Sequence, residues 1–429
     1  MVLCPAGDKS DEDDEEFESA VYDDIEEEDT IQHIRTLPNI EVHDGYNAPD
    51  LSTINGERHS ASDAFLKPNL HRQNLRLQSH SQVIKILING GRRAIGVMYI
   101  HNGKVKKVYA RKEVILSAGA IDSPKLLLLS GIGPKEQLQT HGIRSVVDLK
   151  GVGQNFQDHP LVAGISYTTE RNAENLIPMM YGGNSQRDYI RNRTGPLSVP
   201  FGVVGYFTVN LGVDPDPNVE DTLFLFQSVL MGTDFGLVGV STYGYTREVF
   251  QDYLREQGGR TGFVITVKLN WPKSRGSVSL RSKNPMEAPV IDPNYLSHPD
   301  DVEMLLKSIK YALIIGNTTA LKDGLGAKLY DKPLLGCKHL KHGSDDYWRC
   351  FVRRMLSIGY HPSGTCKMAP PSDPDGVVSP RLKVRGVEGL RVIDASIMPL
   401  ITSSNLNAPT MMIGEKGASM IKEDWGYVE

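Results

Sequence analysis

Several features that mark other protein classes are missing from this sequence of 429 residues. It has no run of eighteen or more apolar residues, so we expect no membrane-spanning helix. Its four cysteines form no CxxC pair, so we expect no zinc site and no other metal. The first residues, MVLCPAGDKSDEDD, lack the apolar core of a secretory signal peptide. No GxGxxG fingerprint between a strand and a helix occurs anywhere.

Charge is unevenly distributed along the chain. The net charge is −5, yet the stretch Asp8–Asp29 holds fourteen acidic residues and one basic residue, Lys9. The remainder has 46 basic and 38 acidic residues, a net of +8. We therefore predict an acidic, mostly disordered segment over residues 1–54. An acidic tail that binds a partner is the alternative. The thin positive charge elsewhere gives no reason to expect nucleic acid as a partner.

The amounts of apolar and charged residue, 40% and 23%, are ordinary for a globular protein. The length exceeds that of a single core, which predicts two domains or one composite domain. Cys337 and Cys350 bracket a short polar segment and are candidates for a disulfide, with unpaired thiols as the alternative. The sequons at Asn192 and Asn317 would permit glycosylation. These signals together favour an extracellular location for the full-length protein.

Local patterns predict a strand meander followed by helices. The pieces LRLQ and QVIKILI between Asn74 and Asn89 predict strands, as does AIGVMYI after them. Asn102-Gly103 is typical of a tight hairpin turn. VILSAG and LRVIDAS predict buried strands. We expect a helix capped by Asp122 or Ser123 and starting at Pro124, and another over Asp300–Ile315.

Two segments near the C-terminus carry candidate chemistry. His361 lies in YHPSGT, and an imidazole that titrates near neutrality can take the hydroxyl proton of an alcohol. A structural role is the alternative, because a single histidine does not make a site. The last helix is expected to start at Pro409 with Asn407 near its cap. Its positive end would stabilise an anion, although a plain cap explains the same pattern.

Five long motifs resemble one enzyme family in order and spacing. They are ILSAGAIDSPKLLLLSGIGP, GVGQNFQDHP, SRGSVSLRSKNPMEAPVIDPNYL, YHPSGTCKM and LRVIDASIMPLITSSNLNAPTMMIGEKGASMI. Together, over about residues 55–425, they resemble the GMC (glucose-methanol-choline) oxidoreductases. The chain is most similar in character to the insect glucose dehydrogenases of that family, which pass electrons to quinone-type acceptors.

The resemblance implies a mixed α/β fold with an incomplete, doubly wound FAD-binding domain and a substrate domain that has an antiparallel sheet with flanking helices. The implied divisions are 55–160 for part of the FAD-binding domain, 161–380 for the substrate domain and 381–429 for the return to the FAD-binding domain. The implied cofactor is FAD, and the implied activity is oxidation of CH–OH groups in a small sugar or alcohol, with a quinone-type electron acceptor.

The resemblance also implies roles for individual residues. His361 is similar to the family's catalytic base, and Asn407 to a second active-site position that orients the substrate oxygen. The implied FAD contacts are Val83 at the adenine, Ala118 and Gly119 at the adenosine, Asp394 and Ala395 near the pyrophosphate and ribityl chain, and Thr410 and Met411 at the pyrimidine edge.

The sequence departs from the family at its N-terminal side, where a βαβ unit with GxGxxG is expected. We therefore interpret the chain as an N-terminally truncated member, and we expect it to bind FAD poorly by itself because buried strands lose partners. Two alternatives to a dehydrogenase remain. One is a flavin-bearing lyase of the same fold, and the other is a non-catalytic remnant.

Overall fold

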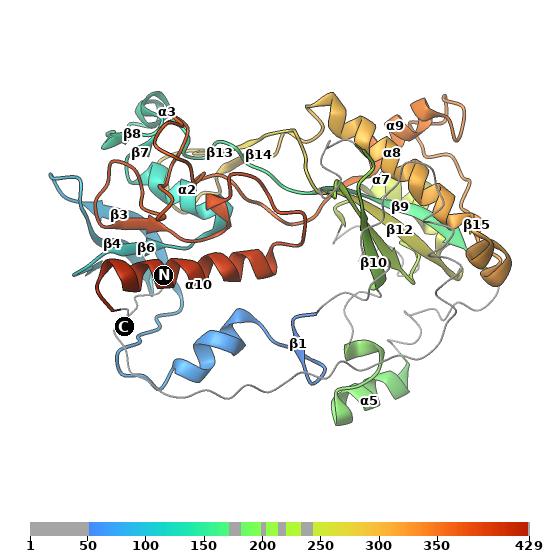
Figure 1. Cartoon of the computed structure of the whole chain (residues 1–429), viewed down its shortest axis with the longest axis horizontal. Coiled ribbons are helices and arrows are strands. Elements are labelled where there is room, and N and C mark those ends of the chain that lie inside the picture. Colours follow the sequence, from blue (N-terminus) through green and yellow to red (C-terminus); the bar gives the residue numbers. More distant parts are fainter. Residues whose placement is uncertain (1–50, 171–181, 199–202, 213–219, 233–242, 428–429) are drawn as a thin grey trace.

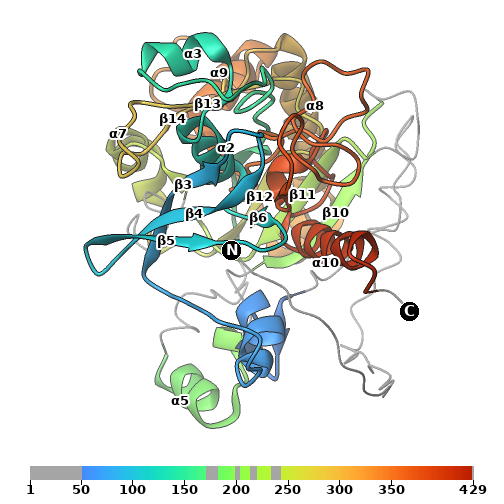
Figure 2. The same cartoon turned by 90° about the vertical axis from the view of Figure 1, so that its left-hand side faces the viewer.

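The structure is a computed structural model that describes residues 51–170, 182–198, 203–212, 220–232 and 243–427. The acidic stretch Asp8–Asp29 lies outside these described residues. Two lobes stand side by side along the long axis of the molecule (Figure 1), and Figure 2 views the lobe that contains the C-terminus end-on. Each lobe has its own cluster of buried apolar side chains. This arrangement confirms the mixed α/β class.

The first lobe is built on a six-stranded antiparallel sheet, as the resemblance implied. Its order is β10 (Val203–Val209), β11 (Thr222–Gln227), β12 (Gly262–Leu269), β9 (Pro160–Thr168) and β15 (Lys328–Leu329), and β16 (Leu356–Ile358) also pairs with β9. β12 is buried along its whole length, and β9 is buried at every residue but the last. Such strands carry continuous apolar runs because both faces of the sheet are covered.

Two helices supply part of that cover. α8 (Pro299–Gly316) and α9 (Asp345–Met355) lie beside the sheet in Figure 1. α8 begins one residue before its expected start and ends one residue after its expected end, with Asp300 and Asp301 in its first turn. Acidic residues there interact favourably with the positive end of the helix dipole. Ser344 caps α9 by accepting a hydrogen bond from Tyr347 N at 3.3 Å.

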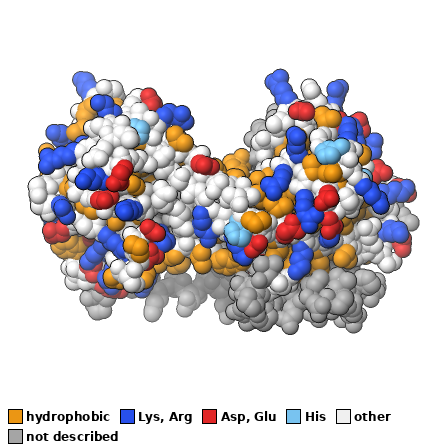
Figure 3. Space-filling view, turned by 90° about the horizontal axis from the view of Figure 1, so that it is seen from above, with side chains coloured by type: hydrophobic (Ala, Val, Ile, Leu, Met, Phe, Trp, Pro, Cys, Tyr) orange, Lys and Arg blue, Asp and Glu red, His pale blue; other side chains and the backbone are white. Residues whose placement is uncertain are grey.

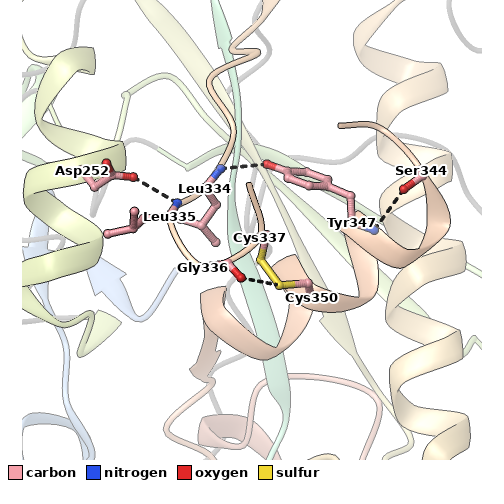
Figure 4. Close-up of a disulfide and its surroundings, with 8 residues drawn as sticks. All are labelled: Asp252, Leu334, Leu335, Gly336, Cys337, Ser344, Tyr347 and Cys350. Carbon is pink, nitrogen blue, oxygen red and sulfur yellow. Dashed lines mark hydrogen bonds between the residues drawn. A yellow bond between two sulfur atoms is a disulfide. The ribbon is translucent and has the colours of Figure 1, made fainter. Parts of the chain in front are cut away.

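The disulfide that the cysteine spacing suggested is present in this lobe. Cys337 and Cys350 are bonded, which joins α9 to the segment before it (Figure 4). The Tyr347 hydroxyl accepts a hydrogen bond from Leu334 N at 3.1 Å beside the bridge. Asp252 accepts another from Leu335 N at 3.0 Å. The bridge therefore lies in a segment that hydrogen bonds also anchor.

The second lobe contains the strand meander. β3 (Ser81–Ile88), β4 (Ala94–His101) and β5 (Lys104–Tyr109) form a three-stranded antiparallel sheet. The expected hairpin is confirmed, since Asn102 and Gly103 have φ values of +50° and +71°. The LRLQ piece is not a strand, so that expectation was wrong. Residues 75–78 pair with no strand in the described part of the chain, and alternation alone does not form a strand.

A short parallel pair lies next to the meander. β6 (Val114–Leu116) pairs with β17 (Leu390–Val392), so the two buried strands predicted from VILSAG and LRVIDAS are partners. Among the described residues, β6 has a strand on this side only. Parallel sheets are normally covered and extended on both sides. The open edge of β6 is consistent with an incomplete sheet.

Helix α2 (Gly119–Leu129) follows β6 and starts earlier than expected. Neither Asp122 nor Ser123 caps it, and Pro124 lies inside it. Gly119 N donates instead to Asp394 Oδ2 at 2.9 Å. The cap is therefore a carboxylate 275 residues away, and the local sequence held no signal for it.

The other strands and α-helices of the described chain lie before, between and after these elements. They are β1 (Thr53–Ile54), β2 (Glu57–Arg58), β7 (Ile132–Gly133), α3 (Lys135–Thr140), β8 (Val147–Asp148), α5 (Gly183–Asn192), α7 (Arg247–Val249), β13 (Ser277–Ser279), β14 (Val290–Asp292) and the last helix α10 (Asn407–Asp424). Within the described ranges, no helix combines the length and apolar character that crossing a bilayer needs.

Candidate functional site

Three strand ends of the six-stranded sheet meet at one edge. Leu161, at the start of β9, pairs with Lys268 near the end of β12 and with Ser357 in β16. The segment before β9 therefore lies next to the segment after β16. The first carries His159 and the second carries His361, so two histidines that are 202 residues apart in sequence are brought together.

The loop that carries His361 is fixed by hydrogen bonds. His361 N donates to Asp158 Oδ1 at 2.8 Å. Ser363 N donates to Gln157 O at 2.9 Å, and Gln157 N donates to Ser363 O at 3.1 Å. Gly359 precedes the loop, and a Cβ there would lie 2.7 Å from His361 Nδ1. The absence of a side chain at 359 leaves the space that the imidazole occupies.

The hydrogen bonds of the two imidazoles determine which ring nitrogens carry a proton. His159 Nε2 lies 2.9 Å from Thr402 O, and His159 Nδ1 lies 2.9 Å from His361 Nδ1. A carbonyl oxygen only accepts, so His159 Nε2 must carry the proton. Neutral His159 then accepts at Nδ1, and His361 Nδ1 must donate. This assignment leaves Nε2 of neutral His361 with a free lone pair.

Burial and charge keep both histidines neutral. Burial and then the positive charge of Lys268 lower the pKa of His361 to about 4. Burial, followed by the charges of Lys268 and His361, lowers the pKa of His159 to about 2, although the carbonyls of Thr402 and Asn270 oppose this. Both imidazoles are therefore neutral at neutral pH, each with one N–H, as the hydrogen bond between them requires.

Asp158 accepts two hydrogen bonds that fix the backbone at His361. Its Oδ2 accepts from the Tyr295 hydroxyl at 2.7 Å, while Oδ1 accepts from His361 N. Burial raises the pKa of Asp158, and these hydrogen bonds lower it in part. Burial also raises the pKa of Tyr295 above its ordinary value, so the hydroxyl stays a donor. The carboxylate thus orients the backbone at His361.

A second loop closes over the histidines. Gln157 Nε2 donates to Pro399 O at 3.1 Å, and Ile401 N donates to Gln157 Oε1 at 3.2 Å. The side-chain amide of Gln157 therefore holds residues 399–401 by two hydrogen bonds. The next residue, Thr402, contacts His159. This places the segment that leads into α10 next to the histidine pair.

A cleft of about 200 Å³ opens where β6 ends. Val83 and Ala118 both line it, together with apolar residues of β6 and α2 and the charged side chains of Asp122 and Lys125. Ligands of open α/β sheets bind outside the carboxyl ends of the strands. The cleft thus suits the adenosine side of the implied FAD, and it brings together two residues that the sequence pointed to.

The residues implied at the pyrophosphate are engaged within the chain. Asp394 Oδ2 accepts from Gly119 N and from the Ser123 hydroxyl at 2.6 Å, and Oδ1 accepts from Ser396 N at 2.8 Å. Ala118 N is bonded to Ser123 Oγ at 3.1 Å. No free backbone donor for a pyrophosphate therefore remains at residues 118 and 119. The cleft residues fit the nucleoside part of FAD, and the backbone N–H groups of residues 118 and 119 are already bonded within the chain.

Backbone pairing connects this region to the histidine loop. Gly364 N donates to Ala395 O at 3.2 Å, and Cys366 N donates to Ser396 O at 2.8 Å. Ala395 thus joins the loop of His361 to the end of β17. The contacts proposed for Asp394 and Ala395 with a cofactor stay predictions.

The remaining expected site residues lie at the start of α10. The helix begins at Asn407, so Pro409 is its third residue and the expected start was two residues late. Asn407 does not cap the helix; its Nδ2 donates to Ser52 Oγ at 2.8 Å. Among the described residues, no hydrogen bond joins Asn407 to His361. Thr410 and Met411 are half-buried. The active-site roles of all three stay predictions.

Sequence reasoning missed two residues of the site, His159 and Lys268. His159 lies within the quoted GVGQNFQDHP motif, directly before a buried strand, and that position was a usable signal. Lys268 interrupts the apolar strand FVITVKL. Lysine is rarely buried, so its position inside such a strand was a second usable signal.

Seen from above, a groove separates the two lobes (Figure 3). On this face Lys and Arg side chains are interspersed with Asp and Glu, with no large area of one sign.

Comparisons with known proteins agree with the motifs. The chain is 36% identical over 386 residues to glucose dehydrogenase [FAD, quinone] of Drosophila melanogaster, which covers 89% of this chain and 58% of the relative. It is 38% identical over 383 residues to human mitochondrial choline dehydrogenase, and the match covers 88% of this chain and 59% of that relative. The chain thus spans less than two thirds of the length of these relatives.

Solved structures share the fold. Formate oxidase from Aspergillus oryzae, in a variant studied for FAD modification, superposes with a TM-score of 0.72 at 26% identity and covers 87% of this chain and 64% of that one. The glucose dehydrogenase is named for FAD and quinone, and the formate oxidase structure concerns modification of its FAD. Family profiles described as GMC oxidoreductase match residues 36–161 and 272–414. The chain belongs to the GMC oxidoreductase family.

Proposed function

We propose that this chain is the substrate-facing part of an FAD-dependent oxidoreductase that acts on CH–OH groups of a sugar or small alcohol. The observation that carries the proposal is the proton arrangement of the histidine pair. His361 Nδ1 donates to His159, so His361 Nε2 is a free base. A general base needs a lone pair and a fixed orientation, and both are supplied here.

In the proposed reaction, the substrate hydroxyl gives its proton to His361 Nε2. FAD, when bound, supplies the acceptor for the hydride that leaves the same carbon. The products are a carbonyl compound, a protonated imidazole and a reduced cofactor, so atoms and electrons balance. Thr402 O fixes the tautomer and orientation of His159, and His159 in turn orients His361 through their hydrogen bond. Asp158 accepts a hydrogen bond from His361 N and holds the backbone at that residue.

Asn407 is proposed to assist by hydrogen-bonding the substrate oxygen. Its side chain is exposed and its carboxamide cannot act as a base. For that role its Nδ2 would have to exchange the Ser52 hydroxyl for the substrate. The names of the relatives include glucose and choline dehydrogenases, which supports an alcohol-bearing substrate and a quinone-type electron acceptor.

FAD binding by this chain alone is expected to be weak. The open edge of β6 and the engaged N–H groups at residues 118 and 119 support this. The test is a titration of the purified chain with FAD, followed by flavin fluorescence and the visible spectrum after gel filtration. A stoichiometric yellow protein would contradict this expectation.

The oxidoreductase role itself is tested by flavin reduction in a protein that carries a complete flavin site together with these residues. A sugar or alcohol substrate should bleach the flavin under anaerobic conditions. A lyase would turn over its substrate with no net bleaching, and a non-catalytic protein would do neither.

A further inference from the structure

Lys268 is a buried cation that the proposed reaction does not use. Its side chain is 1% exposed, and it lies next to Val267 and Leu269 in a strand that is buried along its length. Removing an ammonium group from water is costly unless polar partners replace the lost hydration. A lysine in this position therefore needs a reason.

The contacts of Lys268 point toward the histidine pair. Its Nζ donates to Ser403 O at 3.2 Å. The preceding carbonyl, Thr402 O, accepts from His159 Nε2 at 2.9 Å. Two consecutive carbonyls of one loop thus bind the ammonium and the imidazole, which places the positive charge next to His159 and, through it, His361.

No salt bridge neutralises this charge among the described residues. Asp158 is the carboxylate that acts on Lys268, yet its two oxygens accept from His361 N and the Tyr295 hydroxyl. Burial lowers the pKa of Lys268 to about 7, and Asp158 opposes that change. The titratable groups that interact electrostatically with Lys268 are thus the Asp158 carboxylate, which other donors hold, and the imidazoles of His159 and His361.

We propose that Lys268 is a positioning residue. Its Nζ ties the loop at Ser403 to β12, and its positive charge opposes the entry of a further proton into the neutral His159–His361 pair, in which each imidazole carries one N–H. Without this charge, a proton would enter the pair more readily. A doubly protonated His361 has no lone pair and cannot accept the substrate proton. The catalytic meaning rests on the proposed function, but the protonation effect can be measured without turnover.

The test is an NMR titration of the chain labelled with 13C at the histidine Cε1 positions, with His361→Asn used to assign the resonance. Two variants remove the charge. Lys268→Met also removes the donor to Ser403 O, whereas Lys268→Gln keeps an N–H donor. Lys310→Met is the matched control, because Lys310 is a lysine on the surface of α8 that pairs with Asp345.

Both Lys268 variants should raise the titration midpoint of His361 by about one pH unit, the lower end of what a nearby like charge contributes. The control should leave it unchanged. An unchanged or lower midpoint in either folded Lys268 variant would overturn the proposal. A midpoint that rises in the Met variant alone would show that the tether acts and the charge does not, and it would also overturn the electrostatic part.

The unsubstituted chain gives a second measurement if neither variant folds. The His361 resonance should show a smaller second step near pH 7, where Lys268 loses its proton. A single step would contradict the coupling. Failure here is distinct from failure of the proposed function, because that function is tested by flavin reduction and this proposal is tested by the titration of His361 without turnover.

Discussion

The hydroxyl of Thr365 donates to the carbonyl oxygen of Ala120 at 2.6 Å, and this carbonyl is the one that Pro124 leaves without a helical donor. In a regular helix the N–H of residue 124 would bond to the carbonyl of residue 120, but proline has no N–H. A residue of the histidine loop therefore completes helix α2 beside the proposed nucleotide cleft.

We predict that Thr365→Val will destabilise the protein by about 1–3 kcal/mol, because valine keeps the shape and leaves a buried carbonyl without a partner. Thr365→Ser retains the hydroxyl and should lose less. Urea unfolding followed by circular dichroism measures the difference. Equal stability of the Val variant and the parent would show that Ala120 O finds another donor.

Two glycines of α10 should respond in opposite directions to alanine. A Cβ at Gly417 would lie 2.6 Å from Ile393 Cγ2, whereas nothing lies within 4 Å of one at Gly414. Gly417→Ala should destabilise by about 1–3 kcal/mol through overpacking. Gly414→Ala should stabilise by about 0.5–1 kcal/mol because alanine favours helix. Thermal unfolding of the two variants tests the packing of α10, and a destabilising Gly414→Ala would contradict it.

Loss of the Cys337–Cys350 bridge should lower stability by about 3 kcal/mol, the value expected for a loop of roughly fifteen residues. The double variant Cys337→Ala/Cys350→Ala and the reduced parent should both melt at lower temperature than the oxidised parent. Reductant should not affect the double variant. Identical melting of the oxidised and reduced parent would mean that the bridge contributes nothing.

Stability should decline as pH falls below about 6.5. The folded protein holds His361 and His159 at pKa values of about 4 and 2, below the ordinary value of 6.5. The unfolded chain therefore binds protons first, so the stabilisation is complete above pH 6.5 and is lost toward pH 4 and below. Protonation of each histidine in the unfolded chain should lower the free energy of unfolding by about 2 kcal/mol at pH 5 relative to neutral pH.

Urea unfolding at pH 7.5 and pH 5 measures this effect. His159→Gln should show a smaller loss between the two pH values than the parent. His71→Gln changes an exposed histidine and should retain the full loss. If His159→Gln lost as much stability as the parent, the buried histidines would not be the cause.

The strand meander could be predicted because its signals are local. The alternation in QVIKILI and the Asn102-Gly103 turn each act over a few residues. The start of α2 could not be predicted, since Asp394 caps it from the far end of the chain. The pairing of β6 with β17 was not predicted, because the two strands are far apart in the sequence and parallel partners carry no local signal for each other.

The histidine pair illustrates the same limit within the site. The loop chemistry around His361 marked it as a candidate base. His159 and Lys268 act on it only because β9, β12 and β16 end at one edge of the sheet. Register across an antiparallel sheet depends on pairing between distant segments, and a single sequence does not encode that pairing in any short motif.

The most direct test of the account is the rate of anaerobic flavin reduction by an alcohol or sugar substrate, in a protein with a complete flavin site, compared between the parent and His361→Ala. Loss of the general base should slow reduction by about 10²–10⁴-fold at pH 7. An unchanged rate, with substrate still bleaching the flavin, would contradict the assignment of His361 as the base.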